Sequence, residues 1–273
     1  MAGAYAAEED EQRRCERMRR LIREAGDSAS PASPATRAPG TIVQFWDDSE
    51  SVPGDVADCL ETWASLDAMG FRRVLYDDRS ARRFVADRLS VRHVSAFDRC
   101  RHPAMRSDYF RLCYLLSAGG AYVDADDVYT GADPSALFVD GLIPLQPLCY
   151  DQATGGMVGP DEYLGQAQPS PQWIFYVNNN PIIAPPGHPM LRAALDRATR
   201  LLLDGQDRRL DVQSTTGPGN LTAALVAHAN NQDAKRTSRD FAFLPRWERV
   251  AVSRWPLGYR LDSRNWRLWD PSA

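Results

Sequence analysis

Three acidic residues close together after a short apolar stretch form the most suggestive chemical pattern in the sequence. Asp124, Asp126 and Asp127 follow the segment AYV at residues 121–123. On an extended strand alternate side chains share a face, so Asp124 and Asp126 would lie side by side at the strand's end. Carboxylates this close repel one another, and a divalent cation removes the repulsion. Oxygen ligands without His or Cys favour Mg²⁺ or Mn²⁺, although the same pattern alone also fits a solvated strand end.

A charged pair precedes this strand on a segment with a helical pattern. Residues 102–120 begin with a His-Pro and end with a Gly pair, as helices often do. At about 100° per residue, Asp108 and Arg111 fall on the same face as two leucines. Charges on a buried face are costly unless they are paired or bound to something. The pair is therefore either a structural ion pair or part of a ligand site.

The segments around these residues predict an α/β fold. Strand-like runs alternate with amphipathic helical patterns, which is typical of a domain built around a mostly parallel sheet flanked by helices. Such sheets bind ligands at the carboxyl ends of their strands, where the acidic residues would lie. In chain order the expected elements are a strand at 41–46, a helix at 55–70, a strand at 71–76, helices at 80–89 and 102–120, and a strand at 121–126.

The composition excludes several classes of protein. A chain of 273 residues with 44% hydrophobic and 25% charged residues can form a sizeable core. Its net charge of -4 argues against a polyanion binder, so no nucleic-acid partner is expected. Five cysteines without a C-x-x-C and four histidines without ligand spacing predict neither a disulfide framework nor a zinc site. Lys235 is the only lysine, so a catalytic lysine is expected nowhere else, and this Arg-rich composition is typical of a bacterial genome of high GC content.

The N-terminal part of the chain is expected to lie outside the main domain. A helical pattern covers residues 8–25, and a Ser/Pro/Ala-rich stretch without periodicity follows. We therefore expect an N-terminal helix over residues 1–26, a linker over 27–40 and a single domain over 41–273. The first residues carry acids where a secretory signal needs a basic start, and no stretch approaches the roughly 20 apolar residues of a membrane span. A cytoplasmic protein without integral membrane association is expected.

The stretch RSDYFRLCYLLSAGGAYVDADD resembles the sugar-binding D-x-D region of family 32 glycosyltransferases and the related clostridial glucosylating toxins. The shared pattern is a Ser-Asp, an Arg three residues later, an apolar helix, a Gly-Gly, an aromatic residue and the D-x-D. Three further segments resemble the same family, so the similarity covers roughly residues 41–230. They are IVQFW at 42–46, NNNPIIAPPGHPMLRAAL at 178–195 and TTGPGNLTAAL at 215–225.

This resemblance implies a GT-A fold and metal-dependent transfer of a sugar from a UDP- or GDP-sugar donor, with retention of configuration. It implies that Asp108 and Arg111 hold the sugar hydroxyls and that Asp124 contacts the ribose and the metal's shell. Asp126 would bind Mn²⁺ or Mg²⁺ at the diphosphate, and Trp46 would stack on the base. The catalytic set is Asp108, Arg111, Asp124 and Asp126, and the donor-binding set is Trp46, Asp108, Arg111, Tyr122, Asp124, Asn180, Gly217 and Asn220.

Several of these residues also have ordinary structural interpretations. Gly217 and Asn220 open a helix whose N–H groups would meet a diphosphate, but they equally fit a helix-entry turn. Asn180 before a proline is common turn chemistry, and His188 before Pro189 is expected to cap a helix rather than act as a base. The last tryptophans and their neighbours either close over the donor as a lid or pack onto the domain. These residues are Arg264, Trp266, Arg267 and Trp269.

Two other functions remain open at this stage. One is a non-catalytic protein of the same fold that binds sugar nucleotides or glycans. The other is a phosphatase of the haloacid-dehalogenase type, which would need its D-x-D near the domain start, then a Lys or Arg and a later acidic pair; here an α/β pattern precedes Asp124, and no acidic strand motif follows Lys235. For the acceptor, the expectation is a small molecule or a glycan.

Overall fold

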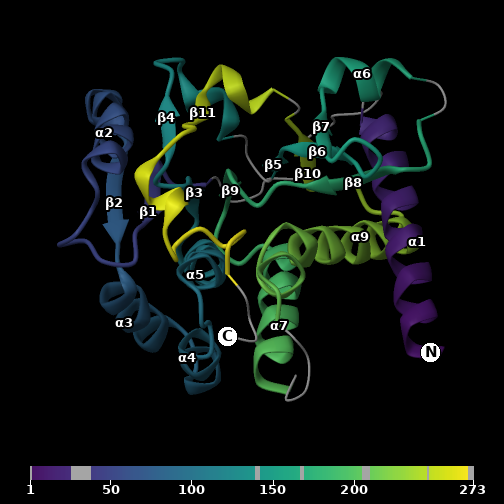
Figure 1. The fold of residues 1–273 in the computed structure, drawn as a ribbon, viewed down its shortest axis with the longest axis horizontal. Helices are drawn as coiled ribbons and strands as arrows, with labels where there is room; N and C mark the ends of the chain where they lie inside the picture. The colour runs from purple at the N-terminus through teal and green to yellow at the C-terminus, as the bar shows by residue number, and fades with distance from the viewer. Residues whose placement is uncertain are drawn as a thin grey trace.

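A four-stranded sheet lies at the centre of the computed structural model, in the order β2-β1-β3-β9 (Figure 1). β1 (Thr41–Phe45) pairs in parallel with β2 (Arg72–Tyr76) and with β3 (Gly120–Tyr122). β9 (Ile182–Ala184) adds an antiparallel edge strand, so the expectation of a mostly parallel sheet is confirmed. The structure describes residues 2–25, 38–138, 142–166, 169–204, 210–244 and 246–269.

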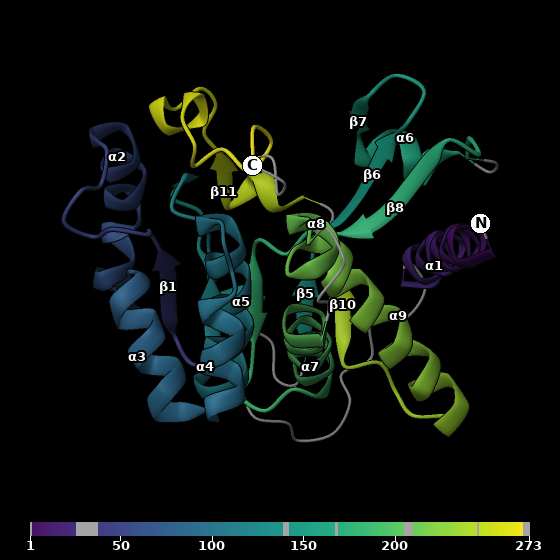
Figure 2. The same cartoon turned by 60° about the horizontal axis from the view of Figure 1, so that its bottom comes forward.

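Helices cover this sheet because alternate residues of its strands face two hydrophobic clusters. Val43 and Phe45 pack with the cluster that contains the central helix α5, whereas Ile42 packs with Trp63 and Leu66 on the other face. Figure 2 shows α3, α5 and α7 side by side across the molecule. The helices are α1 (Ala2–Ala25), α2 (Gly54–Thr62), α3 (Asp78–Arg88), α4 (Val91–Asp98), α5 (Pro103–Ala118), α6 (Pro160–Gly165), α7 (Pro189–Asp204), α8 (Val212–Thr215) and α9 (Pro218–Lys235).

The expected helices are present with shifted boundaries. The pattern at 55–70 divides into α2 and a 3₁₀ helix over Trp63–Met69, which ends at Gly70 with a φ of 83°. α3 begins two residues earlier than expected, because Asp77 and Ser80 form a reciprocal cap at its start. α4 was not expected from the sequence. Further 3₁₀ turns occur at Pro134–Leu137, Trp247–Arg249 and Gly258–Leu261.

The Gly119-Gly120 pair sets the geometry between α5 and β3. Both residues have positive φ, at 69° and 116°. A Cβ on Gly119 would lie 2.7 Å from the Pro186 ring, and one on Gly120 would lie 2.8 Å from the Thr41 carbonyl oxygen. Only glycine fits such a close approach in this conformation. The pair therefore lets the chain leave α5 and enter the sheet immediately.

Smaller sheets and the N-terminal helix complete the fold. α1 packs against the main core through Met18, Leu21 and Ile22, which are 0%, 2% and 6% exposed, and it lies beside β8 and α9 (Figure 2). None of the described helices is long and apolar enough to cross a membrane. Residues 27–37 of the expected linker lie outside the described residues. The remaining strands are β4 (Asp127–Tyr129) with β11 (Ala251–Ser253), β5 (Ile143–Leu145) with β10 (Phe241–Phe243), and β6 (Pro147–Asp151) between β7 (Gly156–Val158) and β8 (Trp173–Val177).

Candidate active site

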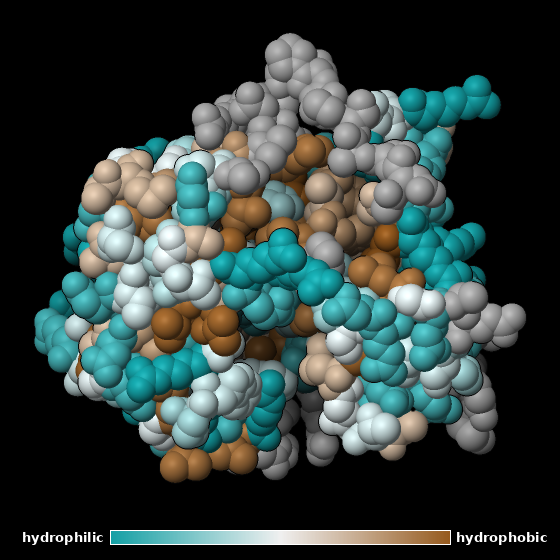
Figure 3. All heavy atoms as spheres, turned by 90° about the horizontal axis from the view of Figure 1, so that it is seen from above, coloured by the Kyte–Doolittle hydropathy of each residue, from teal (hydrophilic) through white to brown (hydrophobic). Residues whose placement is uncertain are grey.

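A cavity of about 580 Å³ opens where β1 and β3 end. The residues around it come from the ends of these strands, the first turns of α5, the asparagines after β8 and the C-terminal segment over 254–269. Viewed from above, hydrophobic residues appear in separate areas among hydrophilic ones rather than in one band (Figure 3). Among the lining residues are Trp46, Asp108, Arg111, Asp124, Asp126 and Arg260.

The D-x-D residues lie in a turn rather than on a strand. β3 ends at Tyr122, and the Asp127 N–H donates to the Asp124 carbonyl at 3.2 Å. The expected alternation, with Asp124 and Asp126 side by side on one extended strand, is therefore wrong. Pairing with β1 ends after Val123, and the chain then turns into β4, which pairs with β11 instead. The turn gives each carboxylate its own set of partners.

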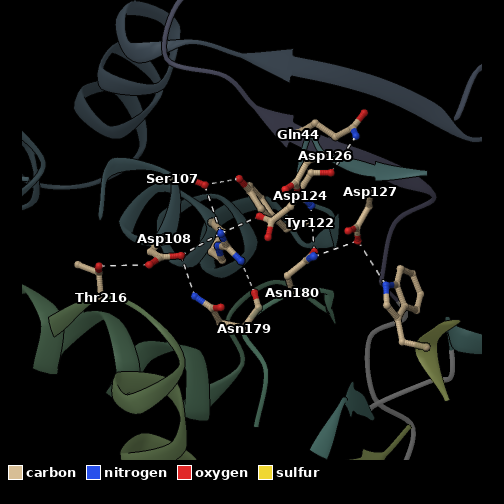
Figure 4. Close-up of polar contacts among 12 residues, drawn as sticks. Gln44, Ser107, Asp108, Tyr122, Asp124, Asp126, Asp127, Asn179, Asn180 and Thr216 are labelled. Carbon is tan, nitrogen blue, oxygen red and sulfur yellow. Dashed lines mark hydrogen bonds and ion pairs between the residues drawn. The ribbon is translucent and has the colours of Figure 1, made fainter. Parts of the chain in front are cut away.

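Arg111 contacts several polar residues of the site, among them Ser107, Asp108 and Asp124, which Figure 4 labels. Its Nη2 donates to Asp124 Oδ1 at 2.9 Å and to Ser107 Oγ at 3.2 Å, and it lies 2.9 Å from Asp108 Oδ1. Its Nη1 donates to the Asn179 carbonyl. The residue is only 3% exposed, yet it lines the cavity. The expected ion pair with Asp108 is thus present, and it stands at the ligand-accessible edge of the core.

Asp108 is a buried carboxyl group with an unusual protonation equilibrium. Its Oδ1 accepts a hydrogen bond from Asn179 Nδ2 at 2.7 Å, and its Oδ2 accepts a long one from Thr216 Oγ1 at 3.4 Å. Burial raises the pKa of Asp108 to about 6, although Arg111 opposes the rise. A Cβ on Gly217 would lie 3.2 Å from Asp108 Oδ2, so a larger residue at position 217 would crowd that oxygen.

Asn180 fastens the D-x-D turn from both sides. Its Oδ1 accepts the Asp124 backbone N–H at 2.9 Å, and its Nδ2 donates to Asp127 Oδ2 at 2.9 Å. The same Oδ2 accepts a long hydrogen bond from Trp247 Nε1 at 3.4 Å, while Oδ1 is buried without a partner among the described residues. Burial, reinforced by the neighbouring carboxylates, raises the pKa of Asp127 to about 7. The side chain of Asn180 therefore positions the turn.

Asp126 is held by the C-terminal segment. Its Oδ2 accepts a hydrogen bond from the Tyr259 hydroxyl at 2.7 Å. The same oxygen forms an ion pair with Arg260 Nη2. The carboxylate of Asp126 and the guanidinium of Arg260 belong to side chains that are each 12% exposed. Burial and the Asp126 charge raise the pKa of the Tyr259 hydroxyl, which keeps it a donor at neutral pH. Neither contact was predictable from local spacing, because Arg260 is 134 residues away from Asp126 in the chain.

Trp46 lines the cavity with its ring covered. It is 7% exposed and belongs to a small cluster with Val56 and Leu257. The Tyr259 ring meets it edge-on at 5.2 Å, and the Arg264 guanidinium lies over it at 5.4 Å. The indole N–H is buried without a partner among the described residues. Any flat ligand on this indole would therefore have to displace Tyr259 or Arg264.

Three predicted donor-binding residues do not line the cavity. Tyr122 is fully buried, where its hydroxyl bonds Ser107 Oγ at 2.7 Å and its ring lies 4.3 Å from the Arg111 guanidinium. Asn220 is also fully buried, and its Nδ2 donates to the Ala194 carbonyl in α7 at 3.0 Å. Together with Gly217, these residues support the cavity wall from behind. Of the predicted C-terminal lid, Arg264, Trp266 and Arg267 line the cavity, whereas Trp269 lies 5.3 Å from the His102 ring.

The fold also gathers two histidines and an acid that the sequence spacing did not connect. His228 Nε2 lies 2.8 Å from Asp240 Oδ1, and His188 Nε2 lies 3.4 Å from Asp240 Oδ2. His188 Nδ1 accepts the Met190 backbone N–H at 3.3 Å, which confirms the expected helix cap. A neutral imidazole that accepts at Nδ1 carries its proton on Nε2. In this tautomer His188 Nε2 carries a proton on the side of Asp240, whereas a metal ligand would need a lone pair there.

The acidic turn fits a divalent cation better. The side chain of Asp124 is 34% exposed, and only its Oδ1 is bound by Arg111. Asp127 Oδ1 is a buried oxygen without a described partner, and Asp126 lines the same cavity. Carboxylate oxygens of this kind are the ligands that Mg²⁺ and Mn²⁺ prefer. Asp126 Oδ2, however, is already paired with the Arg260 guanidinium.

Comparison with known proteins finds a matching family model and similar solved structures. Residues 53–132 match the family model described as "Glycosyltransferase sugar-binding region containing DXD motif". Among solved structures, "PaToxG Glycosyltransferase" has a TM-score of 0.50 and 16% sequence identity, and the match covers 84% of this chain and 83% of that chain. At this identity the structural likeness concerns the fold. No curated protein matches the sequence. The matched sequence region contains Asp108, Arg111 and the Asp124-Ala125-Asp126 turn, so the expected family resemblance is confirmed.

Proposed function

We propose that this glycosyltransferase, whose residues 53–132 are a sugar-binding region with a DXD motif, transfers a sugar from a nucleotide-sugar donor to an acceptor hydroxyl. The proposal rests on one observation: a buried Asp–Arg pair, an acidic turn and a tryptophan converge on one cavity of about 580 Å³. Ligand sites for small molecules commonly measure about 300–1,000 Å³. We assign the activity to a single domain over residues 41–273.

The donor sugar is assigned to Asp108 and Arg111. Both line the cavity, and their hydrogen bonds to Asn179 and Asp124 fix their rotamers. The one described hydrogen bond to Asp108 Oδ2 is the long one from Thr216 at 3.4 Å, so this carboxylate retains the capacity to accept from a sugar hydroxyl. A planar guanidinium held this way binds vicinal oxygens in a fixed geometry.

The diphosphate end of the donor is assigned to the acidic turn. Asp126 and Asp124 would hold Mn²⁺ or Mg²⁺, with Asp127 Oδ1 as a further oxygen beside them. When bound, such a cation neutralises the negative charge that develops on a departing diphosphate. Asn180 holds the turn in place through Asp124 N–H and Asp127. The nucleotide base is assigned to Trp46, once Tyr259 and Arg264 have moved from its ring.

We assign the reaction to the retaining class. The acidic groups Asp108 and Asp124 would stabilise the positive charge that develops on the sugar ring at the transition state. Arg111 binds one oxygen of each of these two carboxylates, and we assign neither of them as a covalent nucleophile. A same-face attack by the acceptor hydroxyl agrees with this arrangement. The acceptor class remains a small molecule or a glycan.

A donor screen tests the proposal. The chain is heated with a panel of UDP- and GDP-sugars in the presence of Mn²⁺ or of a chelator. A donor at about 100 times its dissociation constant adds about 2.7 kcal/mol, which for a chain of this size raises the melting temperature by about 5–10 °C. Release of nucleoside diphosphate on adding candidate acceptors then measures transfer.

A matched pair of variants locates the cation. Asp126→Asn is expected to abolish the Mn²⁺-dependent stabilisation and the transfer, because it removes charge without volume. Asp67→Asn is the control, since this exposed carboxylate pairs with Arg73 and does not line the cavity. Stabilisation by no donor, or full stabilisation of the Asp126→Asn variant, would contradict the proposal.

A further inference from the structure

Asp126, the carboxylate assigned to a divalent cation, is already paired with a positively charged side chain of the protein. Arg260 Nη2 forms an ion pair with Asp126 Oδ2, and the Tyr259 hydroxyl donates to the same oxygen. Both donors come from one 3₁₀ turn, Gly258–Leu261, in the C-terminal segment. A carboxylate assigned to a divalent cation is therefore neutralised by a guanidinium in this structure.

Several contacts hold the Arg260 side chain and backbone in place beside Asp126. Its guanidinium lies 3.4 Å from the Trp255 ring centroid, and the Asn265 side chain donates to its carbonyl at 2.7 Å. Its side chain is 12% exposed, and its Nε is buried without a partner among the described residues. Among the described residues, Asp126 is the acidic partner of the guanidinium, whose other contacts are the Trp255 and Tyr259 rings, so the loss of Asp126 leaves a poorly satisfied buried charge.

Tyr259 contacts both Asp126 and Trp46. Its hydroxyl bonds Asp126, while its ring packs edge-on against Trp46 at 5.2 Å. Loss of the hydrogen bond to Asp126 would therefore free the Tyr259 ring to move away from Trp46. The turn also has an attachment that does not involve Asp126, because the Gly258 N–H donates to Asp55 Oδ2 at 2.6 Å.

We propose that Arg260 and Tyr259 form a latch that closes on Asp126 in the absence of metal and that a divalent cation opens. Arg260 and Tyr259 both occupy Asp126 Oδ2, so a cation that binds this oxygen has to displace them, and repulsion between the two positive charges favours that displacement. Release of Arg260 frees Tyr259, and Tyr259 then uncovers the Trp46 ring. The Asp55 contact keeps the turn attached, so the change is local to residues 254–262. This inference rests on the assignment of Asp126 to a cation under the proposed function.

The test measures Mn²⁺ binding without any donor, by the electron paramagnetic resonance signal of free Mn²⁺. Arg260→Gln is expected to bind Mn²⁺ about tenfold or more tightly than the natural chain, because the competing charge is gone. Arg260→Lys retains the charge and is expected to stay within about threefold of the natural chain. Arg267→Gln is the matched control, since Arg267 also lines the cavity and lies 5.0 Å from the Trp255 ring, but it acts on Asp126 only through its charge at a distance, without a described hydrogen bond or ion pair.

Hydrogen exchange supplies the second readout. Mn²⁺ is expected to speed exchange in peptides covering residues 254–262 of the natural chain, and the Arg260→Gln variant is expected to exchange fast without metal. Melting curves verify that each variant is folded. Mn²⁺ affinity that is unchanged or weaker in Arg260→Gln overturns the latch alone, because the cation then binds without competition. Absence of Mn²⁺ binding from every variant overturns both the latch and the cation assignment.

Discussion

Replacement of Asp127 by asparagine is expected to stabilise the protein at neutral pH. The pKa of Asp127 is raised to about 7 by burial, whereas an unfolded aspartate titrates near 3.9. The folded state therefore binds the proton more tightly, and stability falls as pH rises from about 4 to about 7. At about 1.4 kcal/mol per pH unit, ionisation of Asp127 costs about 4 kcal/mol by pH 8. Asparagine mimics the neutral acid, and its carbonyl oxygen still accepts from Asn180 and Trp247.

Urea unfolding at pH 5, 6, 7 and 8 with a chelator present measures this effect. The Asp127→Asn variant is expected to be more stable than the natural chain at pH 8, and the difference is expected to shrink by about 1.4 kcal/mol per unit between pH 7 and pH 5. Asp133→Asn is the control, because the pKa of that exposed carboxyl is lowered by Ser135 and its effect appears only in more acidic solution. A difference that does not vary with pH, or a variant less stable at every pH, would refute the assignment of a buried neutral acid.

Three further variants test other parts of the site and the fold. Arg111→Lys is expected to lose about 2–4 kcal/mol of stability, because it replaces charge-assisted hydrogen bonds worth about 1.5–3 kcal/mol each, and to lose donor binding as well; intact donor binding would remove Arg111 from the sugar site. Trp46→Ala is expected to weaken nucleotide binding by about 5- to 150-fold, as loss of a stacked base does, and unchanged affinity of the folded fraction would rule out stacking. Gly119→Ala is expected to destabilise the chain by more than about 1 kcal/mol, since its φ of 69° is unfavourable for alanine and the Cβ would lie 2.7 Å from Pro186; a melting curve identical to that of the natural chain would contradict this.

The parts of the fold that follow local patterns were predictable. The strand around residues 41–46 and the helix at 102–120 appear as β1 and α5 within a few residues of the expected bounds. The turn after Tyr122 was not predictable, because it depends on β4 leaving the central sheet to pair with β11, more than 120 residues later in the chain. An alternating pattern of apolar and acidic residues fits an extended strand and such a turn equally well.

The candidate site divides in the same way. The Asp108–Arg111 pair was predictable, because helical spacing alone brings the two side chains to one face. The roles of Tyr259 and Arg260 were not, because nothing in the spacing of a C-terminal segment indicates which carboxylate it will reach. Asn180 was expected at the donor; it lines the cavity, and its hydrogen bonds to Asp124 and Asp127 also make it a support for the turn. Burial and tertiary pairing decide these roles, and neither is encoded in local sequence.

The contacts of the acidic turn also differ in how much chain must be ordered to make them. Arg111 reaches Asp124 across 13 residues, whereas Arg260 reaches Asp126 across 134. With closure entropy growing as the logarithm of loop length, the second contact costs about 2 kcal/mol more than the first. During folding, α5, the Gly119-Gly120 pair and the acidic turn are therefore expected to assemble early as one local unit. The contacts of Tyr259 and Arg260 with Asp126 are expected to form later, after the acidic turn has its folded conformation.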